Sequence, residues 1–509
     1  LLESEFDADF YVARYLADES DAVRREPFAH YHFMGRRLGH SPNPRFDEEW
    51  YLAFYPDVRR AVGRGELLCG FHHYLVAGIG ERRMPCYALE GALESSVPGI
   101  TRPDLIGRTR DIAERLRPIR MEVRGDAPRT VWIFVPRLNP DITFGGYRAL
   151  FELVAALAPY AAERGVRLSV VTTEERAANP DYFAWRTRDE PYAAVFRSIE
   201  VRARSDIDCM AIGPRDRFLV YTSWDALLAA PLAAATDDPR VIALVQEFEP
   251  LFHDHSSLHA LSRAGLEVPS YPIFNTAVLR DYFAAHRVGI FRHRHRSPPQ
   301  AGRDYAVFEH VINRLPLQDA GALAARSERT LVLYARPERH AARNLYEVAG
   351  LALANLCRTG RFDRRWRFVG IGCMSRCPPV DLGGGHRLEF VQKMPEADYR
   401  RFVTEVDIGV SLMYAPHPSL IPFELATTGA LVVTNTFENR PPGFFARISR
   451  NILACPPGID AVAAAVAAAI PRVEDRPARI ARAYRPPERT WRDVFGPAFL
   501  DAAFGPLLA

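Results

Sequence analysis

From residue 130 onward, short apolar runs alternate with longer stretches in which apolar residues recur at helical spacing. Runs such as 131–135 and 241–245 are rich in Val, Ile and Leu, which is typical of strands buried on both faces of a parallel sheet. The stretch 147–164 has the pattern of an amphipathic helix. The alternation therefore predicts parallel sheets covered by helices, an α/β architecture.

The series of apolar runs breaks near residues 315–328 and then starts again, so we expect two sheets. The expected strands are 131–135, 168–172, 218–222 and 241–245 in the first half and 331–334, 367–370, 388–391, 408–412 and 431–434 in the second. Two such halves face each other across a cleft, and open α/β sheets bind ligands at the carboxyl ends of their strands. Functional side chains should therefore lie on the loops that follow strands.

The first 85 residues contain an internal repeat. Segment 6–15 recurs as 46–55, and segment 28–35 recurs as 71–78, a period of about forty residues. The Asp of each Phe-Asp pair can cap a helix, and the Gly that ends the second segment can end another. Each repeat is expected to be a helical hairpin with its aromatic and histidine side chains in the core.

These patterns divide the 509 residues into five parts. We expect an α-helical repeat module over 1–85 and a proline-containing linker over 86–128. Two Rossmann-like domains should follow, over 129–315 and 316–485. Residues 486–509 should form a helix that packs back on the first Rossmann-like domain.

Composition indicates an ordinary soluble globular protein, with 48% hydrophobic and 25% charged residues. The 65 Lys and Arg residues nearly balance the 62 Asp and Glu residues, a net charge of +3. Such a weak field argues against nucleic acid as the main partner.

The seven cysteines are odd in number and thinly spread, which favours a reducing cytoplasm over a disulfide framework. We predict no structural metal, because Cys373 and Cys377 lack a second Cys or His pair at zinc-ligand spacing. No apolar run reaches about 18 residues, and the first residues do not resemble a signal peptide. We therefore expect a cytoplasmic protein, with peripheral contact at the inner membrane face left open.

Two cations follow neighbouring strands of the second half. Arg336 comes after the strand 331–334 and could clamp a diphosphate with its guanidinium fork. Lys393 comes after the strand 388–391 and would place an ammonium at the same edge. Together they could neutralise the charge of a nucleoside diphosphate leaving group without a metal. The alternative is that both are surface cations that cap strand ends.

The stretch 411–430 leaves a strand, passes through a Pro- and Ser-containing loop and begins a helix with Glu424 in its first turn. It resembles the donor-site signature of retaining glycosyltransferase family four, whose fold is GT-B. The resemblance implies that Glu424 bonds the nucleotide ribose or the donor sugar, while the helix N-terminus faces the diphosphate. Without it, Glu424 is an acid favourably placed in a first helical turn. Further donor-binding residues are expected at Gly370, Tyr414, His417, Ser419 and Phe423.

Five segments more narrowly resemble the rhamnosyltransferases of bacterial S-layer and surface glycans. They are 145–148, 245–252, 273–276, 334–337 and 411–430. In such enzymes the equivalents of Arg336, Lys393 and Glu424 hold a dTDP-sugar, which implies this co-substrate and no other cofactor here. The sequence departs from the broader family at Val432, where a second glutamate is usual.

The acceptor side of the cleft should be formed by the first half. Gly145 and Gly146 follow a strand and open a helix that also carries Arg148, so backbone amides can approach a phosphate or sugar. Glu247 and Glu249 follow another strand and could bond acceptor hydroxyls, although either could equally be a solvated loop acid. Asp206-Ile207-Asp208 matches the metal motif of a different glycosyltransferase fold, which two α/β halves disfavour.

The sequence thus predicts a GT-B protein, two Rossmann-like domains facing a cleft and preceded by a small all-α repeat domain. The expected activity is retaining, metal-independent transfer of a sugar, L-rhamnose from dTDP-rhamnose, to a growing bacterial surface polysaccharide. The acceptor could be lipid-linked, and the repeat module, which resembles modules attached to bacterial glycosyltransferases, could contact a membrane or an assembly complex. Two alternatives stay open: a nucleotide-sugar epimerase, and a catalytically degenerate glycan-binding or scaffold protein.

Overall fold

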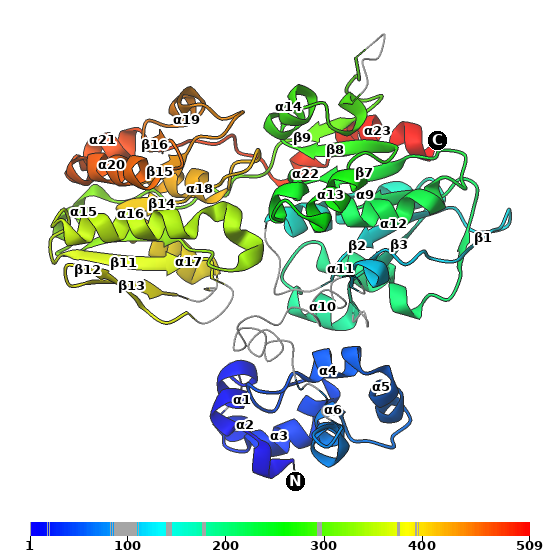
Figure 1. Ribbon diagram of the computed structural model, residues 1–509. Helices are drawn as coiled ribbons and strands as arrows, with labels where there is room; N and C mark the ends of the chain where they lie inside the picture. Colours follow the sequence, from blue (N-terminus) through cyan, green and yellow to red (C-terminus); the bar gives the residue numbers. More distant parts are fainter. Residues whose placement is uncertain are drawn as a thin grey trace. The chain divides into compact units, whose positions relative to one another are not determined.

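The computed structural model describes residues 2–17, 19, 21–81, 83, 85, 109, 111–138, 145–175, 180–292, 298–373, 377–391, 394 and 396–509. The chain forms two compact units, Leu1–Glu114 and Arg115–Ala509 (Figure 1). The first is helical, and the second contains two large sheets.

Each sequence repeat of the first unit forms three helices and a short terminal turn, rather than a simple hairpin. The first repeat contains α1 (Ala8–Tyr15), α2 (Asp21–Arg24), α3 (Pro27–Phe33) and η2 (Gly35–Arg37), after the short η1 (Glu3–Glu5). The second contains α4 (Glu48–Phe54), α5 (Pro56–Gly63), α6 (Gly70–His73) and η3 (Tyr74–Gly78). The extra helix arises where proline, which suits a first helical position, starts a new helix at Pro56.

The predicted helix caps are confirmed, because Asp7 accepts a hydrogen bond from the N–H of Phe10, at 2.9 Å. Asp47 does the same for Trp50. In both repeats a buried tyrosine hydroxyl lies 3.0 Å from a histidine Nδ1, in the pairs Tyr11–His30 and Tyr51–His73.

The repeated glycines serve these tyrosines. A Cβ added at Gly35 or Gly78 would collide with the hydroxyl of Tyr11 or Tyr51, respectively. Gly35 does not end a helix as predicted, because it opens η2.

The first sheet of the second unit has seven parallel strands in the order β4-β3-β2-β6-β7-β8-β9. Its strands are β2 (Thr130–Val135), β3 (Arg167–Thr172), β4 (Glu200–Ala203), β6 (Arg217–Val220), β7 (Val241–Val245), β8 (Ser270–Asn275) and β9 (Ala306–Phe308). The helices around it are α9 (Gly145–Ala162), α10 (Pro180–Arg186), α11 (Ala193–Ser198), α12 (Ser223–Ala233), α13 (Ser257–Gly265) and α14 (Ala277–Ala285), with the short turns η5 (Arg204–Asp206), η6 (Glu249–Phe252) and η7 (Gly289–Phe291).

Alternate residues of β2 enter different cores. Val131, Ile133 and Val135 belong to a cluster that includes α9 and the C-terminal helices. Trp132 and Phe134 belong to another that includes α12. The sheet is therefore buried on both faces, as its continuous apolar strands predict.

The second sheet has the order β12-β13-β11-β10-β14-β15-β16, with only β12 antiparallel to its neighbour. Its strands are β10 (Arg329–Tyr334), β11 (Trp366–Ile371), β12 (Val380–Gly383), β13 (His386–Phe390), β14 (Ile408–Val410), β15 (Leu431–Asn435) and β16 (Ile452–Cys455). Around it lie α15 (Ala320–Ala325), η8 (Arg339–Asn344), α16 (Tyr346–Arg358), α17 (Glu396–Phe402), η9 (Val403–Glu405), α18 (Ile421–Thr428), α19 (Pro442–Ile448), α20 (Ile459–Ala469), η10 (Ile470–Glu474) and α21 (Arg476–Ala481).

Part of the expected linker is a folded portion of the second unit. The strand β1 (Met121–Val123) pairs in parallel with β5 (Met210–Ile212). Arg115 Nη2 lies 2.5 Å from Glu174 Oε1, and the guanidinium carbon of Arg115 lies 4.3 Å from the centre of the Trp224 ring. From Arg115 onward this segment therefore packs against the first Rossmann-like half.

The C-terminal segment forms three short helices, α22 (Trp491–Val494), α23 (Pro497–Ala503) and α24 (Gly505–Leu508), rather than one. They lie beside the first sheet, where red helices join the green elements in Figure 1. The Phe495 ring packs 5.0 Å from the Phe308 ring, and Arg217 donates a hydrogen bond to the carbonyl of Leu507 at 3.0 Å. The predicted α/β fold of two Rossmann-like halves, preceded by a helical region, is confirmed.

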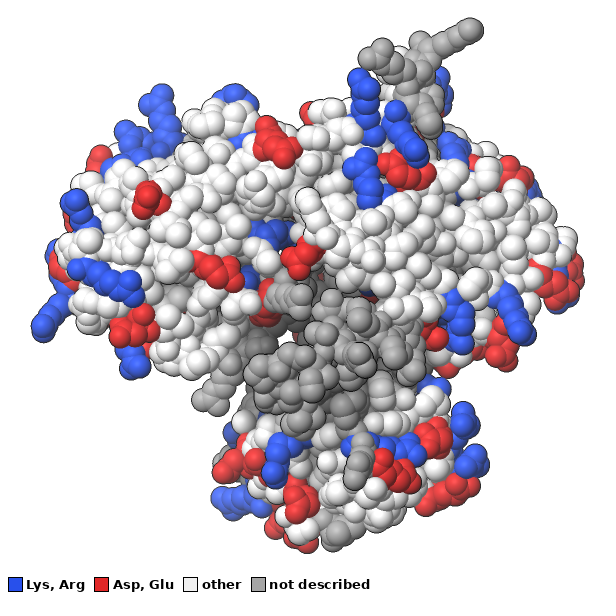
Figure 2. Space-filling model, in the orientation of Figure 1, with Lys and Arg blue, Asp and Glu red and all other residues white. Residues whose placement is uncertain are grey.

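Within the described residues, every helix is too short or too polar to cross a lipid bilayer. Figure 2 shows Lys and Arg side chains interspersed with Asp and Glu side chains on the visible face, in keeping with the small net charge.

Candidate donor and acceptor site

Glu247 joins the two halves of the second unit. The half built on the first sheet is called the acceptor half, and the half built on the second sheet is called the donor half, after the roles expected from the sequence. It follows β7, and its Oε1 accepts hydrogen bonds from the N–H of Phe248, at 2.9 Å, and from the N–H of His417 in the other half, at 3.3 Å. Burial raises the pKa of Glu247, and the charge of Arg343 opposes that shift. This glutamate is therefore a buried acid that faces the donor half, rather than a solvated loop residue.

Arg343 is a cleft residue that the sequence analysis missed. It lies on η8, and its guanidinium sits 4.2 Å from the centre of the Phe252 ring in the opposite half. Burial lowers its pKa, with Glu247 acting against the shift and Arg336 adding to it. Its only sequence signal is its place a few residues after a strand of the second half.

Arg336 leaves the end of β10 and is almost fully buried. Its Nε donates to Glu338 at 3.0 Å, and its Nη1 donates to the Tyr334 hydroxyl at 3.4 Å. Gly372, just beyond β11, has a φ of +94°, and a Cβ there would lie 2.5 Å from the Tyr334 ring and 3.2 Å from Arg336. A glycine at 372 therefore leaves room for this pair.

Gly370 lies inside β11, in keeping with the strand expected over 367–370. A Cβ at this position would meet the Phe390 ring at 2.9 Å and Ala335 at 3.3 Å. The glycine thus serves close packing between strands, and its donor contact stays a prediction. Lys393 lies outside the described residues, and its role stays a prediction.

Glu424 lies in the first turn of α18, as predicted, and is 7% exposed. Its Oε1 accepts a hydrogen bond from Asn313 Nδ2, at 2.8 Å. Tyr399 of α17 lies close enough that the charge of Glu424, after burial, raises the pKa of the Tyr399 phenol. The Tyr399 hydroxyl is buried without a hydrogen-bond partner. Sequence reasoning missed both neighbours of the glutamate.

The other predicted donor residues lie in different surroundings. Tyr414 is 47% exposed, and its N–H donates to the carbonyl of Arg343 at 2.7 Å. Ser419 is buried just before α18. Phe423 packs with Phe445 in a core cluster of the donor half. The structure therefore places Tyr414 beside the cleft arginine and Phe423 in the core.

Gly145 and Gly146 start α9 where the halves approach each other. A Cβ at Gly145 would lie 2.7 Å from Leu420 of the donor half and 3.4 Å from His310 Nε2. A Cβ at Gly146 would lie 2.7 Å from the Tyr221 hydroxyl. Both glycines therefore permit close approach.

Arg148, one turn into α9, is held by acids of its own half. Its Nη2 donates to Glu190 Oε2 at 3.3 Å, and its Nε lies 3.8 Å from Glu152. The Arg148 guanidinium, which was expected to face the cleft, is thus paired with these two glutamates.

Three polar side chains form a hydrogen-bonded row beside these glycines. Asn275, at the end of β8, donates from Nδ2 to Gln246 Oε1 at 2.6 Å and lies 3.2 Å from His310 Nδ1. Burial lowers the pKa of His310 to about 3, with smaller effects from His417 and Arg148. The sequence analysis singled out the segments that hold Gln246 and Asn275, but gave neither residue a role.

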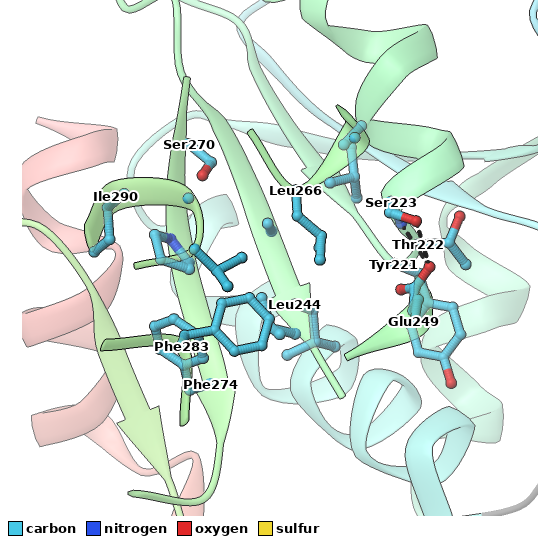
Figure 3. Close-up of a pocket in the computed structure, with 18 residues that line it drawn as sticks. Tyr221, Thr222, Ser223, Leu244, Glu249, Leu266, Ser270, Phe274, Phe283 and Ile290 are labelled. Carbon is cyan, nitrogen blue, oxygen red and sulfur yellow. Dashed lines mark hydrogen bonds between the residues drawn. The ribbon is translucent and has the colours of Figure 1, made fainter. Parts of the chain in front are cut away.

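Glu249 does not join the acceptor side of the cleft. Its Oε2 accepts from the Ser223 N–H at 2.9 Å and from Ser223 Oγ at 2.7 Å, at the start of α12 (Figure 3). It borders a cavity of about 30 Å³ whose other walls include Leu244 and Phe274. Burial raises its pKa to about 7. Glu249 therefore caps a helix inside the first half, while Glu247 faces the donor half.

Among the described residues, no three His, Cys, Asp or Glu side chains are grouped as metal ligands would be. Asp206 and Asp208, the Asp-x-Asp pair, are exposed near η5.

The fold and the site together define a two-domain α/β protein with buried cations and a helix-borne glutamate at the carboxyl ends of its donor-half strands. Residues 329–467 match the family model of the WsaF C-terminal domain. The chain is 27% identical over 191 residues to the O-antigen biosynthesis protein RfbC of Myxococcus xanthus, covering 38% of this chain and 13% of that relative. It thus spans a small part of RfbC.

Similar solved structures include Anabaena Alr3699/HepE in complex with UDP and glucose, with 12% identity, a TM-score of 0.43 and coverage of 70% of this chain and 94% of that one. Another is sucrose-phosphate synthase from Thermosynechococcus elongatus, with 12% identity, a TM-score of 0.43 and coverage of 75% and 96%.

Proposed function

We propose that the unit Arg115–Ala509 is a glycosyltransferase that moves a sugar from a nucleotide donor to a growing bacterial surface polysaccharide. The observation that carries the proposal is a pair of neighbouring cations in the segment that follows β10, the buried Arg336 and the half-buried Arg343 on η8. Two neighbouring guanidinium groups repel each other, and a diphosphate between the halves would offset that repulsion. The match of residues 329–467 and the partial match to an O-antigen biosynthesis protein support the same reading.

Arg336 and Arg343 would stabilise the leaving group, with Lys393 as a further cation. In the transfer, the bond between the sugar C1 and the phosphate oxygen breaks, and a bond forms from C1 to an acceptor hydroxyl. The phosphate carries more negative charge in the transition state than in the bound donor, so fixed cations lower the barrier. The hydroxyl proton passes to the leaving phosphate oxygen if attack occurs on the same face, as in retaining enzymes. In that case no protein base is required.

Glu424 would position the donor. It stands in the first turn of α18, where the helix dipole favours anionic groups and backbone N–H groups face outward. Asn313 fixes one carboxylate oxygen by a 2.8 Å hydrogen bond. A fixed carboxylate can orient ribose or sugar hydroxyls with little loss of side-chain freedom.

For the finer identity, we propose a dTDP-sugar donor, with L-rhamnose as the transferred sugar and retention of configuration. These proposals rest on the resemblance of the segments described above, with Val432 as the one departure. The reaction would need no metal cofactor. The acceptor would be a glycan, lipid-linked in the cell, and the repeat unit would contact the membrane face or an assembly complex in the cytoplasm.

The test is thermal stabilisation of the full chain by dTDP, UDP, GDP and their sugars, with and without EDTA. A ligand at about 100 times its Kd adds roughly 2.7 kcal/mol to stability. We expect stabilisation by one nucleotide that persists in EDTA and is lost in Arg336→Ala. Arg365→Ala is the matched control, because Arg365 is exposed and paired with Asp363.

No stabilisation by any nucleotide would sink the donor site and favour a scaffold protein. Conversion of the donor sugar without an acceptor would instead favour an epimerase.

A further inference from the structure

The row formed by Gln246, Asn275 and His310 contains buried polar atoms that have no hydrogen-bond partner. Asn275 is 3% exposed, yet its Oδ1 accepts no hydrogen bond, and the Nε2 of Gln246 donates none. Leaving such a group buried and unpaired costs about 1–3 kcal/mol. Several such atoms on adjoining residues are typical of a site that is completed by a ligand.

A third atom without a hydrogen-bond partner comes from the donor half. His417 is 9% exposed, and its Nε2 has no hydrogen-bond partner. The backbone N–H of His417 donates a hydrogen bond to Glu247, the residue next to Gln246. A positive charge on His417 would also lower the pKa of His310. The imidazole is therefore close to the row, so both halves contribute to this set of atoms.

The set is neutral near pH 7. Burial lowers the pKa of His310 to about 3 and the pKa of His417 to about 4, and the other two side chains are amides. A phosphate needs cations, which Arg336 and Arg343 supply on a separate loop. A neutral group that both donates and accepts hydrogen bonds suits these side chains better.

The row offers both a hydrogen-bond donor and an acceptor whichever way the side-chain amides of Gln246 and Asn275 are oriented. As assigned, Gln246 keeps a free NH₂, Asn275 a free carbonyl oxygen, and His310 carries its proton on Nε2. If both amides are turned over, Gln246 keeps the carbonyl and Asn275 the NH₂, and His310 Nε2 becomes an acceptor. In both cases the row presents at least one donor and one acceptor.

We propose that Gln246, Asn275, His310 and His417 form a subsite that holds a hydroxyl group of a bound sugar ring. A hydroxyl donates one hydrogen bond and accepts up to two, which matches this mixture of atoms. Gly145 borders the subsite, because a Cβ there would lie 3.4 Å from His310 Nε2. The assignment of the ligand as a sugar rests on the proposed transferase function. The four side chains would then help to decide which sugar is accepted.

The hydroxyl could belong to the donor sugar or to the acceptor sugar, and binding measurements separate the two. The variants are His310→Gln and Asn275→Ser, with His386→Gln as the control, because His386 is a buried histidine that bonds to Phe362 outside the cleft. Calorimetry would measure the affinity of each variant for three ligands. These are the nucleoside diphosphate that stabilises the chain, the corresponding nucleotide sugar, and p-nitrophenyl monosaccharides as acceptor probes.

We expect both variants to bind the nucleoside diphosphate within about twofold of the unchanged chain. Affinity for the nucleotide sugar, or for one p-nitrophenyl monosaccharide, should fall about 10- to 100-fold, the effect of one lost buried hydrogen bond. Weaker binding of the nucleotide sugar would place the donor sugar in the subsite. Weaker binding of the monosaccharide would place the acceptor sugar there. A donor analogue that lacks the held hydroxyl should bind the unchanged chain and His310→Gln alike.

Equal affinities for all ligands in the variants, or an equal loss for the nucleoside diphosphate and its sugar, would overturn the subsite. If no nucleotide binds but a monosaccharide does, and His310→Gln abolishes that binding, the subsite stands and the transferase proposal falls. Binding of neither kind of ligand overturns both.

Discussion

Glu247 in the acceptor half accepts a hydrogen bond from the backbone N–H of His417 in the donor half, at 3.3 Å. The carboxylate also opposes the pKa shifts that burial imposes on Arg343 and Arg440 of the donor half. One acid thus serves as counter-charge to two arginines across the cleft. Glu247 is therefore one of the residues through which the two halves contact each other.

Glu247→Gln keeps a carbonyl oxygen for the hydrogen bond but removes the negative charge. We expect the free energy of unfolding to fall by about 1–3 kcal/mol, because buried arginines lose their counter-charge. Transfer activity should fall at least tenfold. Denaturant unfolding and a donor-consumption assay measure the two effects.

The control for this change is Glu389→Gln, whose carboxylate is exposed on β13. An unfolding free energy equal to that of the control would show that Glu247 does not balance the arginines.

Stability should depend on pH through Glu249. Burial raises its pKa from 4.5 to about 7, so the folded protein binds more protons than the unfolded chain between these values. Its contribution to the free energy of unfolding is therefore fully present below about pH 4.5 and is lost as pH rises through about 7. Glu249→Gln should remove about 1–3 kcal/mol of this decrease.

The measurement is urea unfolding between pH 5 and 8, with the exposed Glu163→Gln as the control. Asp225, whose pKa burial raises to about 6, remains in the variant and keeps part of the slope. A slope that Glu249→Gln leaves unaltered would contradict the assignment.

Much of the fold could be predicted because the central strands carry their own signal. In β10, Leu331 and Leu333 enter one core cluster and Val332 enters another, so an unbroken apolar run is required. The edge strand β12 was missed because it is mostly exposed and ends at Gly383, with no apolar run to mark it. Strand β1 was missed because its three residues are exposed and lie in a segment that prolines suggested was a linker.

The candidate site could be predicted only where one loop defines it. Glu424 and the start of α18 belong to a single local motif, which the sequence reveals. Arg343 and His310 act through partners that come from other elements, and no local pattern marks such convergence. Glu247 and Glu249 look equivalent in sequence, yet the short helix η6 turns the second toward Ser223.

Tyr399→Phe tests the surroundings of Glu424. The Tyr399 hydroxyl is buried without a partner, so its removal should leave the free energy of unfolding unchanged or raise it by up to about 1 kcal/mol. If the hydroxyl contacts the donor, affinity for the nucleotide sugar should fall about tenfold. Calorimetry and unfolding in denaturant measure the two quantities.

Tyr271→Phe is the matched control, because Tyr271 on β8 also has a buried hydroxyl without a partner. It should affect stability similarly and leave donor affinity unchanged. Equal donor affinity in both variants would place Tyr399 outside the donor site.

Gly372→Ala should disturb the donor site through Arg336. Gly372 has a φ of +94°, and its added Cβ would overlap the ring of Tyr334, whose hydroxyl accepts a hydrogen bond from Arg336. Gly385→Ala is a close control, because its φ is +82° and nothing lies within 4 Å of the added Cβ. The control should lose about 1–2 kcal/mol of stability from backbone strain alone.

Gly372→Ala should lose more stability than this control and should weaken nucleoside diphosphate binding at least tenfold, because Tyr334 and Arg336 must shift together. Comparing the unfolding free energies of the two variants in denaturant separates backbone strain from the collision with Tyr334. Calorimetry measures the affinity for the nucleoside diphosphate, which depends on the position of Arg336. If both variants bound the nucleotide equally well, Arg336 would not depend on the space that Gly372 leaves.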